Sequence, residues 1–417
     1  MMKNKVLLKN TVMLYILTFS SYFFSFITVP YQTRVLGPEI YGQLGFAMSF
    51  AMYIQLVLDF GFILSSTEDV SRRRNDRKEL GRILSAVTLC KCVLGILSFI
   101  VVNVLCCTVS RFKTDILLYE LYFLWVFINS LLPDYLYRGM ENMSIITYRT
   151  VAIKLFFTVM IFVFLKDPSQ YYAVPILNAV GSLGAVIWIY FDIYRHLKIH
   201  FERITFSYFC STLKRSFSYF LSRIASTVYG ATNTFILGFL YPTGNIVGYY
   251  TSADKLVSTA RSAFSPISDS LYPYMVKNRD FKLVKKILLL LMPIIIIGCT
   301  VVWIFAEPFC TFLLGKEFRE SGAILRFLIP VVVMTLPSYI MGFPVLSPMG
   351  LAKYANISTI AGAIIQIVGL SILFIFHAIT VKSICVITCV TELFVLLLRC
   401  IVVFRNRHAF QMEESAE

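Results

Sequence analysis

The sequence is poor in acidic residues and in histidine. Its 417 residues include 23 Asp and Glu against 38 Lys and Arg, and only four His. Most of the ten cysteines lie inside apolar runs, and no pair of them has zinc-site spacing with a histidine nearby. We interpret these cysteines as small apolar packing residues. The sequence therefore predicts no disulfide frame, no metal site and no cofactor.

Motifs that carry chemistry in enzymes and motors are also missing. The chain has no glycine-rich phosphate loop followed by Lys and Ser or Thr, so we expect no ATP motor. It has no nucleophile elbow, and no loop is long enough to fold as a separate domain. We therefore predict that the protein is not an enzyme.

Apolar sequence is abundant. Hydrophobic residues make up 58% of the chain and charged residues 15%, and the mean hydropathy is +0.75. Uncharged apolar runs recur along the whole chain, which is typical of an all-α polytopic membrane protein. In a soluble protein the net charge of +15 would suggest nucleic-acid binding. In a membrane protein it indicates basic cytoplasmic loops, so we expect no nucleic-acid partner.

Twelve stretches are long enough to cross a bilayer, which takes about 20 helical residues. They are residues 11–30, 43–66, 83–107, 116–137, 145–165, 172–192, 217–240, 248–275, 287–306, 323–346, 357–376 and 381–404. Loops on the side of the N-terminus hold 23 Lys and Arg, and the opposite loops hold six. Because basic residues gather in cytoplasmic loops, we expect both termini in the cytoplasm. No small-residue cleavage site follows the first stretch, so we expect a retained span and not a signal peptide.

A short internal repeat relates the two halves of the chain. Leu36-Gly37 is followed by Tyr41-Gly42, and Leu237-Gly238 by Val247-Gly248, at offsets of 201 and 206 residues. Repeats of this kind are typical of transporters built from two similar halves. We predict an N-terminal six-helix lobe at 1–205 and a C-terminal six-helix lobe at 206–417.

The span at 248–275 is unusually polar, with four charged residues and eight Ser or Thr. On a helical wheel at about 100° per residue, nine polar residues share one arc: Thr251, Asp254, Lys255, Ser258, Arg261, Ser262, Ser265, Ser268 and Asp269. The loop before it has no basic residue and 277–286 has five, which favours a crossing helix over one lying on the surface. We expect Pro266 to kink this helix and its polar arc to line a cavity.

Basic residues inside the spans mark candidate binding positions, because a charge in the bilayer costs about 2.5 kcal/mol or more. Arg223 is the only charge in 217–240. With Lys255 and Arg261 on the next span it places cations at three depths, which suits the passage of a polyanionic group. Arg149 and Arg399 lie near span ends, and we expect them to extend toward the interface.

Acids inside the spans are candidates for proton or sodium coupling. Asp254 has the best depth and lies on the polar arc, and Asp59 is a second candidate. Asp254 has an alternative role, which is to neutralise the adjacent Lys255 by pairing across helices.

Several motifs resemble those of a known family, the Wzx-type O-antigen or polysaccharide repeat-unit flippases. The opening region contains VPYQTRVLGPEIYGQLGFAMSF and then LDFGF, close to the family pattern PY-x-x-R-V-L-G-x-x-x-[YF]-G with a DFGF-like end to span two. The region 218–273 contains FLSRIAS, ILG, VGYYTSADK and SLYP, and LGKEFRES follows at 314–321. The segment 132–143 departs from the Trp-containing family pattern, with Tyr135 and Tyr137 at the expected aromatic positions.

The resemblance implies membership of the multidrug/oligosaccharidyl-lipid/polysaccharide exporter superfamily, with two six-helix lobes around a central cavity and alternating access. It implies that undecaprenyl-pyrophosphate-linked oligosaccharide is flipped across a bacterial inner membrane for lipopolysaccharide O-antigen or other surface polysaccharide. The family's cationic cavity falls on Arg34, Arg223 and Lys255, to which the wheel adds Arg261. Expected partners are the lipid-linked oligosaccharide, membrane lipid, and the polymerase and chain-length-control proteins of the same pathway.

Two other functions compete with this interpretation. A multidrug exporter of the same superfamily would need acidic cavity residues for cationic drugs, whereas spans seven and eight carry a basic excess. A membrane polysaccharide polymerase would need a sizeable outer loop with catalytic residues, and the longest outer loop here is 307–322.

Overall fold

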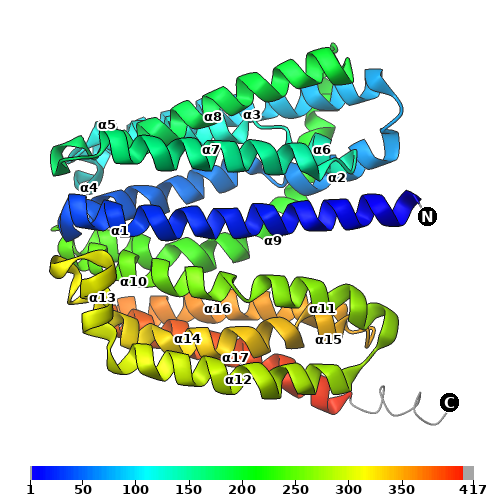
Figure 1. Cartoon of the computed structure of the whole chain (residues 1–417). Coiled ribbons are helices and arrows are strands. Elements are labelled where there is room, and N and C mark those ends of the chain that lie inside the picture. Colours follow the sequence, from blue (N-terminus) through cyan, green and yellow to red (C-terminus); the bar gives the residue numbers. More distant parts are fainter. Residues whose placement is uncertain (1, 407–417) are drawn as a thin grey trace, which may run out of the picture. The chain divides into compact units, whose positions relative to one another are not determined.

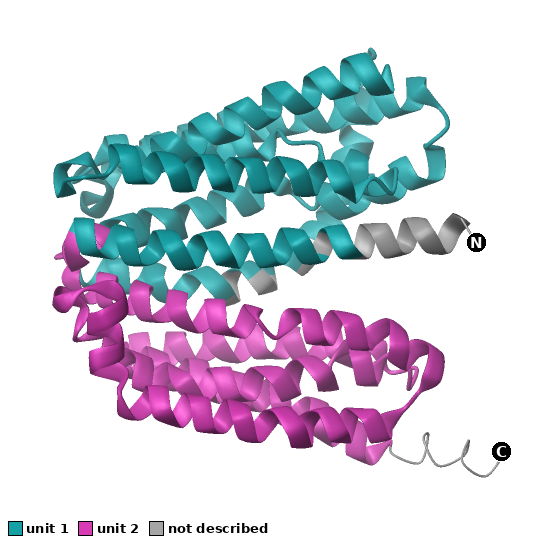
Figure 2. Ribbon diagram, viewed as in Figure 1, with its two compact units in different colours: residues 1–36, 43–242 teal, residues 37–42, 243–417 magenta. Residues whose placement is uncertain are grey.

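The structure is a computed structural model that describes residues 2–406, without the side chains of 2–11, 14, 222, 225, 226, 228 and 229. Every element in that range is helical. Contacts group the residues into two compact units (Figure 2). Unit 1 comprises residues up to 36 together with 43–242, and unit 2 comprises 37–42 together with residues from 243 onward.

The elements follow one another from α1 to α17 (Figure 1). The segments up to Leu240 are α1 (Met2–Asp59), α2 (Phe62–Arg73), α3 (Arg77–Thr108), α4 (Ser110–Lys113), α5 (Ile116–Ser130), α6 (Asp134–Gly139), α7 (Met143–Phe164), η1 (Pro168–Gln170), α8 (Ala173–Asp192), η2 (Ile193–Leu197) and α9 (Phe206–Leu240). The later segments are α10 (Asn245–Ser262), α11 (Ser265–Asn278), α12 (Phe281–Ile304), α13 (Ala306–Leu314), η3 (Lys316–Phe318), α14 (Ser321–Met341), α15 (Phe343–Leu346), α16 (Ala352–Ile375) and α17 (Val381–Arg405).

Nine helical stretches between residues 2 and 406 are long and apolar enough to cross a membrane. The first of them covers two expected spans, 11–30 and 43–66, which α1 joins. The two parts of α1 meet at a kink at Gly37, which has φ 69° and ψ 171°. The expected spans 217–240 and 248–275 fall on α9 and on α10 with α11, which are helical but more polar. The prediction of an all-α polytopic membrane protein is confirmed.

Two expected spans in unit 1 end earlier than the hydropathy indicates. α1 ends at Asp59, and the next residues have positive φ, 37° at Phe60 and 75° at Gly61. α5 ends at Ser130, and α6 begins only after Pro133. Apolar sequence continues through both breaks, so a hydropathy pattern cannot detect them.

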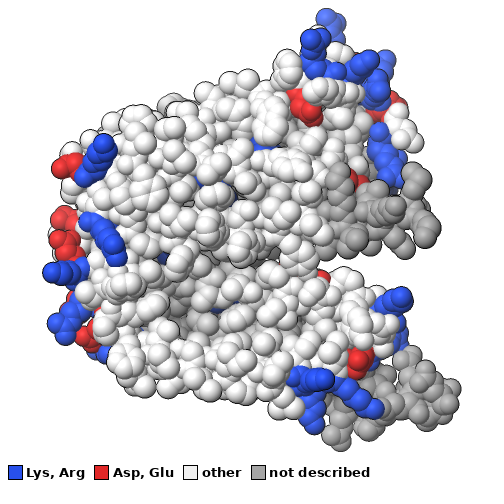
Figure 3. All heavy atoms as spheres, viewed as in Figure 1, with Lys and Arg blue, Asp and Glu red and all other residues white. Residues whose placement is uncertain are grey.

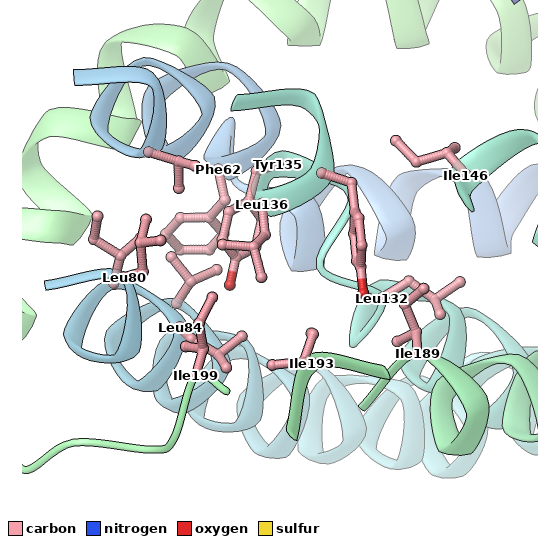
Figure 4. Packing of buried hydrophobic residues seen from close by; sticks show 14 of the residues in the cluster. Phe62, Leu80, Leu84, Leu132, Tyr135, Leu136, Ile146, Ile189, Ile193 and Ile199 are labelled. Carbon is pink, nitrogen blue, oxygen red and sulfur yellow. The ribbon is translucent and has the colours of Figure 1, made fainter. Parts of the chain in front are cut away.

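The core of unit 1 at these breaks is apolar and well packed. Buried side chains from α2, α3, α6, α7, α8 and η2 meet there (Figure 4). The cluster includes Phe62, Leu84 and Tyr135, each at most 2% exposed. The two short helices α2 and α6 are thereby packed against the long ones.

Described side chains of α9 contact other helices of unit 1, although we expected α9 at the start of the second lobe. Ser216 lies 2.7 Å from Ser65, and Thr232 lies 2.7 Å from Tyr53. The Nε of Arg111 donates to the carbonyl of Gly238 at 2.7 Å. The contact grouping therefore places the boundary after Pro242, not at the expected 205/206.

An aromatic cluster holds α9 to α1, α4 and α5. The fully buried ring of Phe46 lies within 6.1 Å, between ring centroids, of Phe112, Tyr119, Phe235 and Phe239. The guanidinium of Arg111 lies 4.8 Å from the centre of the Phe46 ring. Aromatic pairs and cation–π contacts of this geometry each contribute about 0.5–1.5 kcal/mol beyond area burial.

Phe46→Ala is expected to lower the free energy of unfolding by about 3–5 kcal/mol, because it leaves a cavity among four rings. Denaturant titration of the purified protein in detergent measures this loss. Phe19→Ala is the matched control, since Phe19 is on the same helix and 72% exposed. The free energy of unfolding of Phe19→Ala is expected to differ from that of the wild type by no more than about 0.5 kcal/mol. Equal losses in the two variants would show that the cluster does not stabilise the unit.

Unit 2 is built around α14. That helix packs against α10, α12, α13 and α17, and α16 packs against α17. A second apolar cluster joins α11, α12, α14 and α15 through residues such as Leu271, Met275 and Leu336. In each unit large hydrophobic side chains remain exposed along the helices while charged ones gather at helix ends (Figure 3). This pattern fits helices whose sides contact lipid.

Candidate functional site

The polar stretch 248–275 consists of two helices. α10 ends at Ser262 and α11 begins at Ser265. Pro266 lies in the first turn of α11, where it has no N–H to bond to the preceding turn. The predicted kink is confirmed. Beyond the break, Phe264, Ile267 and Leu271 pack into the apolar cluster of α11, α12, α14 and α15.

One side of α10 is packed and the other carries the charged residues. Val247, Tyr250, Ala253 and Val257 are buried at helical spacing. The neighbouring helix α14 packs against α10. Lys255 is exposed, and Asp254, Ser258 and Arg261 are half-buried. Up to Arg261, the charged positions of the predicted arc therefore lie outside the packed side of the helix.

Arg261 forms an ion pair with Glu392 of α17. The carboxylate is the more deeply buried partner, with its side chain 6% exposed against 22% for the arginine. Asp254 interacts electrostatically with both Arg261 and Lys255. In the part of the chain that the structure describes, Asp254 and Lys255 form no ion pair with each other. Unit 2 thus brings together three expected site residues, Asp254, Lys255 and Arg261, with Glu392, an acid inside the span 381–404 whose pairing with Arg261 was not expected.

An acid inside an apolar span, such as Glu392, is a candidate for proton or sodium coupling, but the sequence does not indicate its arginine partner. Its neighbour Thr391 donates to the buried Gln366 of α16 at 2.9 Å. Seven residues further along α17, Arg399 donates to the carbonyl of Ser338 at 2.7 Å and to the hydroxyl of Ser358 at 2.8 Å. The expectation that Arg399 extends to the interface is wrong, because α14 and α16 bind its guanidinium.

A second group of charges lies in unit 1 at the helix breaks. Asp59 accepts a hydrogen bond from Gln55 at 3.0 Å, and it interacts electrostatically with Lys91 and Arg223. The ammonium group of Lys91, which is 5% exposed, donates to the carbonyl of Ser130 at the end of α5. Two expected site residues, Asp59 and Arg223, are therefore brought together, and Lys91 joins them.

Arg149 and Asp134 extend this group. Arg149 is 3% exposed and both of its terminal nitrogens donate to the Asp134 carboxylate. The expectation that Arg149 extends to the interface is wrong, because α6 places an acid beside it. A pair this deeply buried is retained only when both charges are satisfied.

Arg34 is exposed on the first arm of α1, three residues before the turn at Gly37. It belongs to unit 1, as Arg223 does, whereas Lys255 and Arg261 belong to unit 2. The four expected cations therefore fall into two pairs by unit. Between residues 2 and 406, no group of three His, Cys, Asp or Glu is placed to hold a metal ion.

The LGKEFRES motif forms the turn between α13 and α14. Arg319 and Arg326 donate to the Glu307 carboxylate at 3.1 and 3.0 Å. The hydrogen bond from Arg319 is the main cause that lowers the pKa of Glu307 from its ordinary value of 4.5. Phe318 of the same motif packs on Tyr41 and Tyr249. The motif therefore has a structural role in unit 2.

The lowered pKa of Glu307 predicts how the stability of this turn depends on pH. The contribution is present above the unfolded-state pKa and is lost as the pH falls through the lower folded-state pKa. Glu307→Gln is expected to make the melting temperature depend slightly less on pH below about 4.5, measured in detergent. The effect is small because the pair is exposed. An unchanged profile would show that the carboxylate does not stabilise the turn.

Comparison with known proteins connects these features to a family. A family model described as "Polysaccharide biosynthesis protein" matches residues 7–279. Two relatives are named "Putative O-antigen transporter". The one from Shigella dysenteriae is 26% identical over 367 residues, which are 86% of this chain and 91% of the relative. The one from Escherichia coli K12 is 24% identical over 294 residues, which are 69% of each chain.

Solved structures show the same fold at low sequence identity. A structure of the lipid II flippase MurJ has a TM-score of 0.71 at 15% identity, covering 95% of this chain and 87% of that one. An inward-facing multidrug transporter of the MATE family has a TM-score of 0.64 at 14% identity, covering 94% and 96%. These likenesses concern the fold alone. Because the family model matches well over half of the sequence, the chain belongs to the polysaccharide biosynthesis protein family.

Proposed function

We propose that the protein is a flippase for undecaprenyl-pyrophosphate-linked oligosaccharide repeat units in the synthesis of O-antigen or another surface polysaccharide. The observation that carries this proposal is the polar helix α10, which contains the cationic residues Lys255 and Arg261. The chain that contains this helix belongs to a family of polysaccharide biosynthesis proteins. Guanidinium and ammonium groups bind phosphate, and the bidentate geometry of arginine suits it especially well. The names of the two relatives, both "Putative O-antigen transporter", support O-antigen as the class of passenger.

In this proposal the pyrophosphate enters from the cytoplasm and is bound by Arg223 and Arg261. Lys255 and Arg34 assist release on the other side, and the sugars contact hydroxyl and aromatic groups. Access alternates between the two sides while the lipid tail stays in the bilayer. Energy comes from an ion gradient, for which Asp254 and Asp59 are the candidate coupling groups. No bond of the passenger is made or broken, so the protein is not an enzyme.

The proposed location is the bacterial inner membrane with both termini in the cytoplasm. The basic loops carry this orientation, since 23 Lys and Arg lie on the side of the N-terminus and six on the other. The polymerase and the chain-length-control proteins that act on the flipped repeat unit are the proposed protein partners.

Reconstituted vesicles test the function directly. Lipid-linked oligosaccharide is placed in both leaflets, and the fraction accessible to an added glycosidase is followed with time. We expect the protein to expose the inner-leaflet pool, and the mass of the lipid-linked sugar to stay unchanged before digestion. A change in that mass would indicate a polymerase. Accessibility equal to that of protein-free vesicles would contradict the proposal, and movement of cationic drugs instead would indicate a multidrug exporter.

Charge reversal tests the candidate cation of unit 1. Arg223→Glu is expected to slow reorientation at least about tenfold, because losing one charge-assisted contact costs about 1.5–3 kcal/mol. The matched control is Lys382→Glu at the exposed start of α17, which is expected to leave the rate unchanged. An unchanged rate in Arg223→Glu would remove this residue from the proposed path.

A further inference from the structure

The ion pair between Arg261 and Glu392 joins a candidate passenger-binding cation to a carboxylate of the same unit. The two side chains come from α10 and α17, 131 residues apart in the sequence. Only Glu392 is almost fully buried, while more than a fifth of the arginine side chain stays accessible. A ligand therefore reaches the arginine side chain more easily than it reaches the carboxylate.

Both partners lie on helices that are packed against the same third helix. α10 and α17 each pack against α14. Thr391, next to Glu392, is bonded to Gln366 of α16, and both of these side chains are buried. The hydroxyl of Ser252 on α10 lies 2.9 Å from the hydroxyl of Ser321 on α14, which ties the two helices together. The carboxylate is therefore held near Arg261 whether or not a ligand is bound.

An anionic ligand and Glu392 compete for the same guanidinium. A phosphate binds arginine through two parallel N–H donors, the geometry that a carboxylate also uses. A ligand that takes these donors leaves a buried carboxylate without its cation, which is strongly unfavourable. That cost is present only while the ligand is bound, and it is recovered when the ligand leaves.

We propose that Glu392 is a built-in competitor that weakens binding of the passenger's phosphate to Arg261 and displaces it during release. The inference rests on the proposed function and adds a residue that sets affinity and turnover. In the empty protein Glu392 takes the place of the phosphate on Arg261. In the loaded protein the guanidinium turns to the phosphate, and its return to Glu392 promotes release.

The test measures binding and turnover in the same series of variants. The binding probe is farnesyl pyrophosphate, titrated into the full-length protein in detergent, and turnover is measured by the vesicle assay. Glu392→Gln removes the charge at constant size. We expect it to tighten binding of the probe at least about tenfold and to slow reorientation at saturating lipid-linked sugar. If Glu392 had only a structural role, its substitution would not raise the affinity for the probe while lowering the rate of reorientation.

Two further variants keep the test decisive if Glu392→Gln is poorly folded. Glu392→Asp keeps the charge but shortens the side chain, so its affinity is expected between those of wild type and Glu392→Gln. Glu307→Gln removes the carboxylate that Arg319 and Arg326 bind in the same unit, and it is expected to change neither quantity. Unchanged or weaker binding in both Glu392 variants would overturn the inference.

The outcomes separate this inference from the proposed function. If wild type neither binds the probe nor reorients the lipid-linked sugar, the proposed function fails and the inference fails with it. If wild type does both, and the Glu392 variants bind no more tightly, only the inference fails.

Discussion

Arg261→Gln is expected to slow transport strongly and to destabilise the protein at the same time. The variant loses the guanidinium proposed to bind phosphate, and we expect reorientation to slow at least about 100-fold, equivalent to about 2.7 kcal/mol. It also leaves Glu392, whose side chain is 6% exposed, without its ion-pair partner. Breaking a buried pair by removing one member costs about 3–5 kcal/mol. The vesicle assay and denaturant titration measure the two losses separately.

The double variant Arg261→Gln/Glu392→Gln distinguishes the two effects. Two neutral amides need no counter-charge, so we expect most of the lost stability to return. Transport is expected to stay at the level of the single arginine variant, because the phosphate-binding group is still missing. Recovery of transport in the double variant would contradict the role of Arg261. Failure to recover stability would show that the ion pair is not the source of the loss.

The fold could be predicted largely from hydropathy. All twelve expected spans coincide with helices, and the predicted kink at Pro266 is present. The place of α9 could not be predicted, because it depends on the fit of Phe235 and Phe239 to the Phe46 ring. Hydropathy records that such residues are apolar but not which helix they face.

The positions of single charged residues in the candidate site could be predicted from the sequence, but their partners could not. A helical wheel indicated correctly that Arg261 and Asp254 avoid the packed side of α10. A wheel has no information on a partner 131 residues away, so the ion pair with Glu392 was missed. Arg149 and Arg399 were misjudged for the same reason: α6 supplies a carboxylate to one, and α14 and α16 supply oxygens to the other. Distance from a span end alone therefore does not identify an interfacial arginine.

Gly248→Ala is expected to have the largest effect on stability among substitutions of small residues. A Cβ atom at Gly248 would lie 1.9 Å from the carbonyl oxygen of Pro38. A Cβ atom at Gly42 would lie 2.1 Å from the carbonyl oxygen of Gly244. Both obstacles are backbone atoms of unit 2, which cannot rotate away as a side chain would. The segment 37–42 and the start of α10 would have to separate.

We expect Gly248→Ala to lower the free energy of unfolding by about 3 kcal/mol or more, at the upper end of the range for overpacking. Gly298→Ala is the matched control in the same unit, because no atom lies within 4 Å of its Cβ position in α12. There alanine should stabilise the helix by about 0.5–1 kcal/mol. Denaturant titration in detergent should therefore give changes of opposite sign.

The same substitution tests what the internal repeat is for. Gly42 and Gly248 end the two copies of the repeat, and a Cβ atom at Gly42 would lie 2.6 Å from the backbone nitrogen of Gly248. Since the two glycines meet, the repeat has a structural reason at this point: each copy needs a residue without a side chain at their contact. If Gly42→Ala and Gly248→Ala destabilise the protein by similar amounts and the double variant costs less than their sum, one shared contact accounts for both glycines. Additive losses would mean that each glycine is required by a separate neighbour.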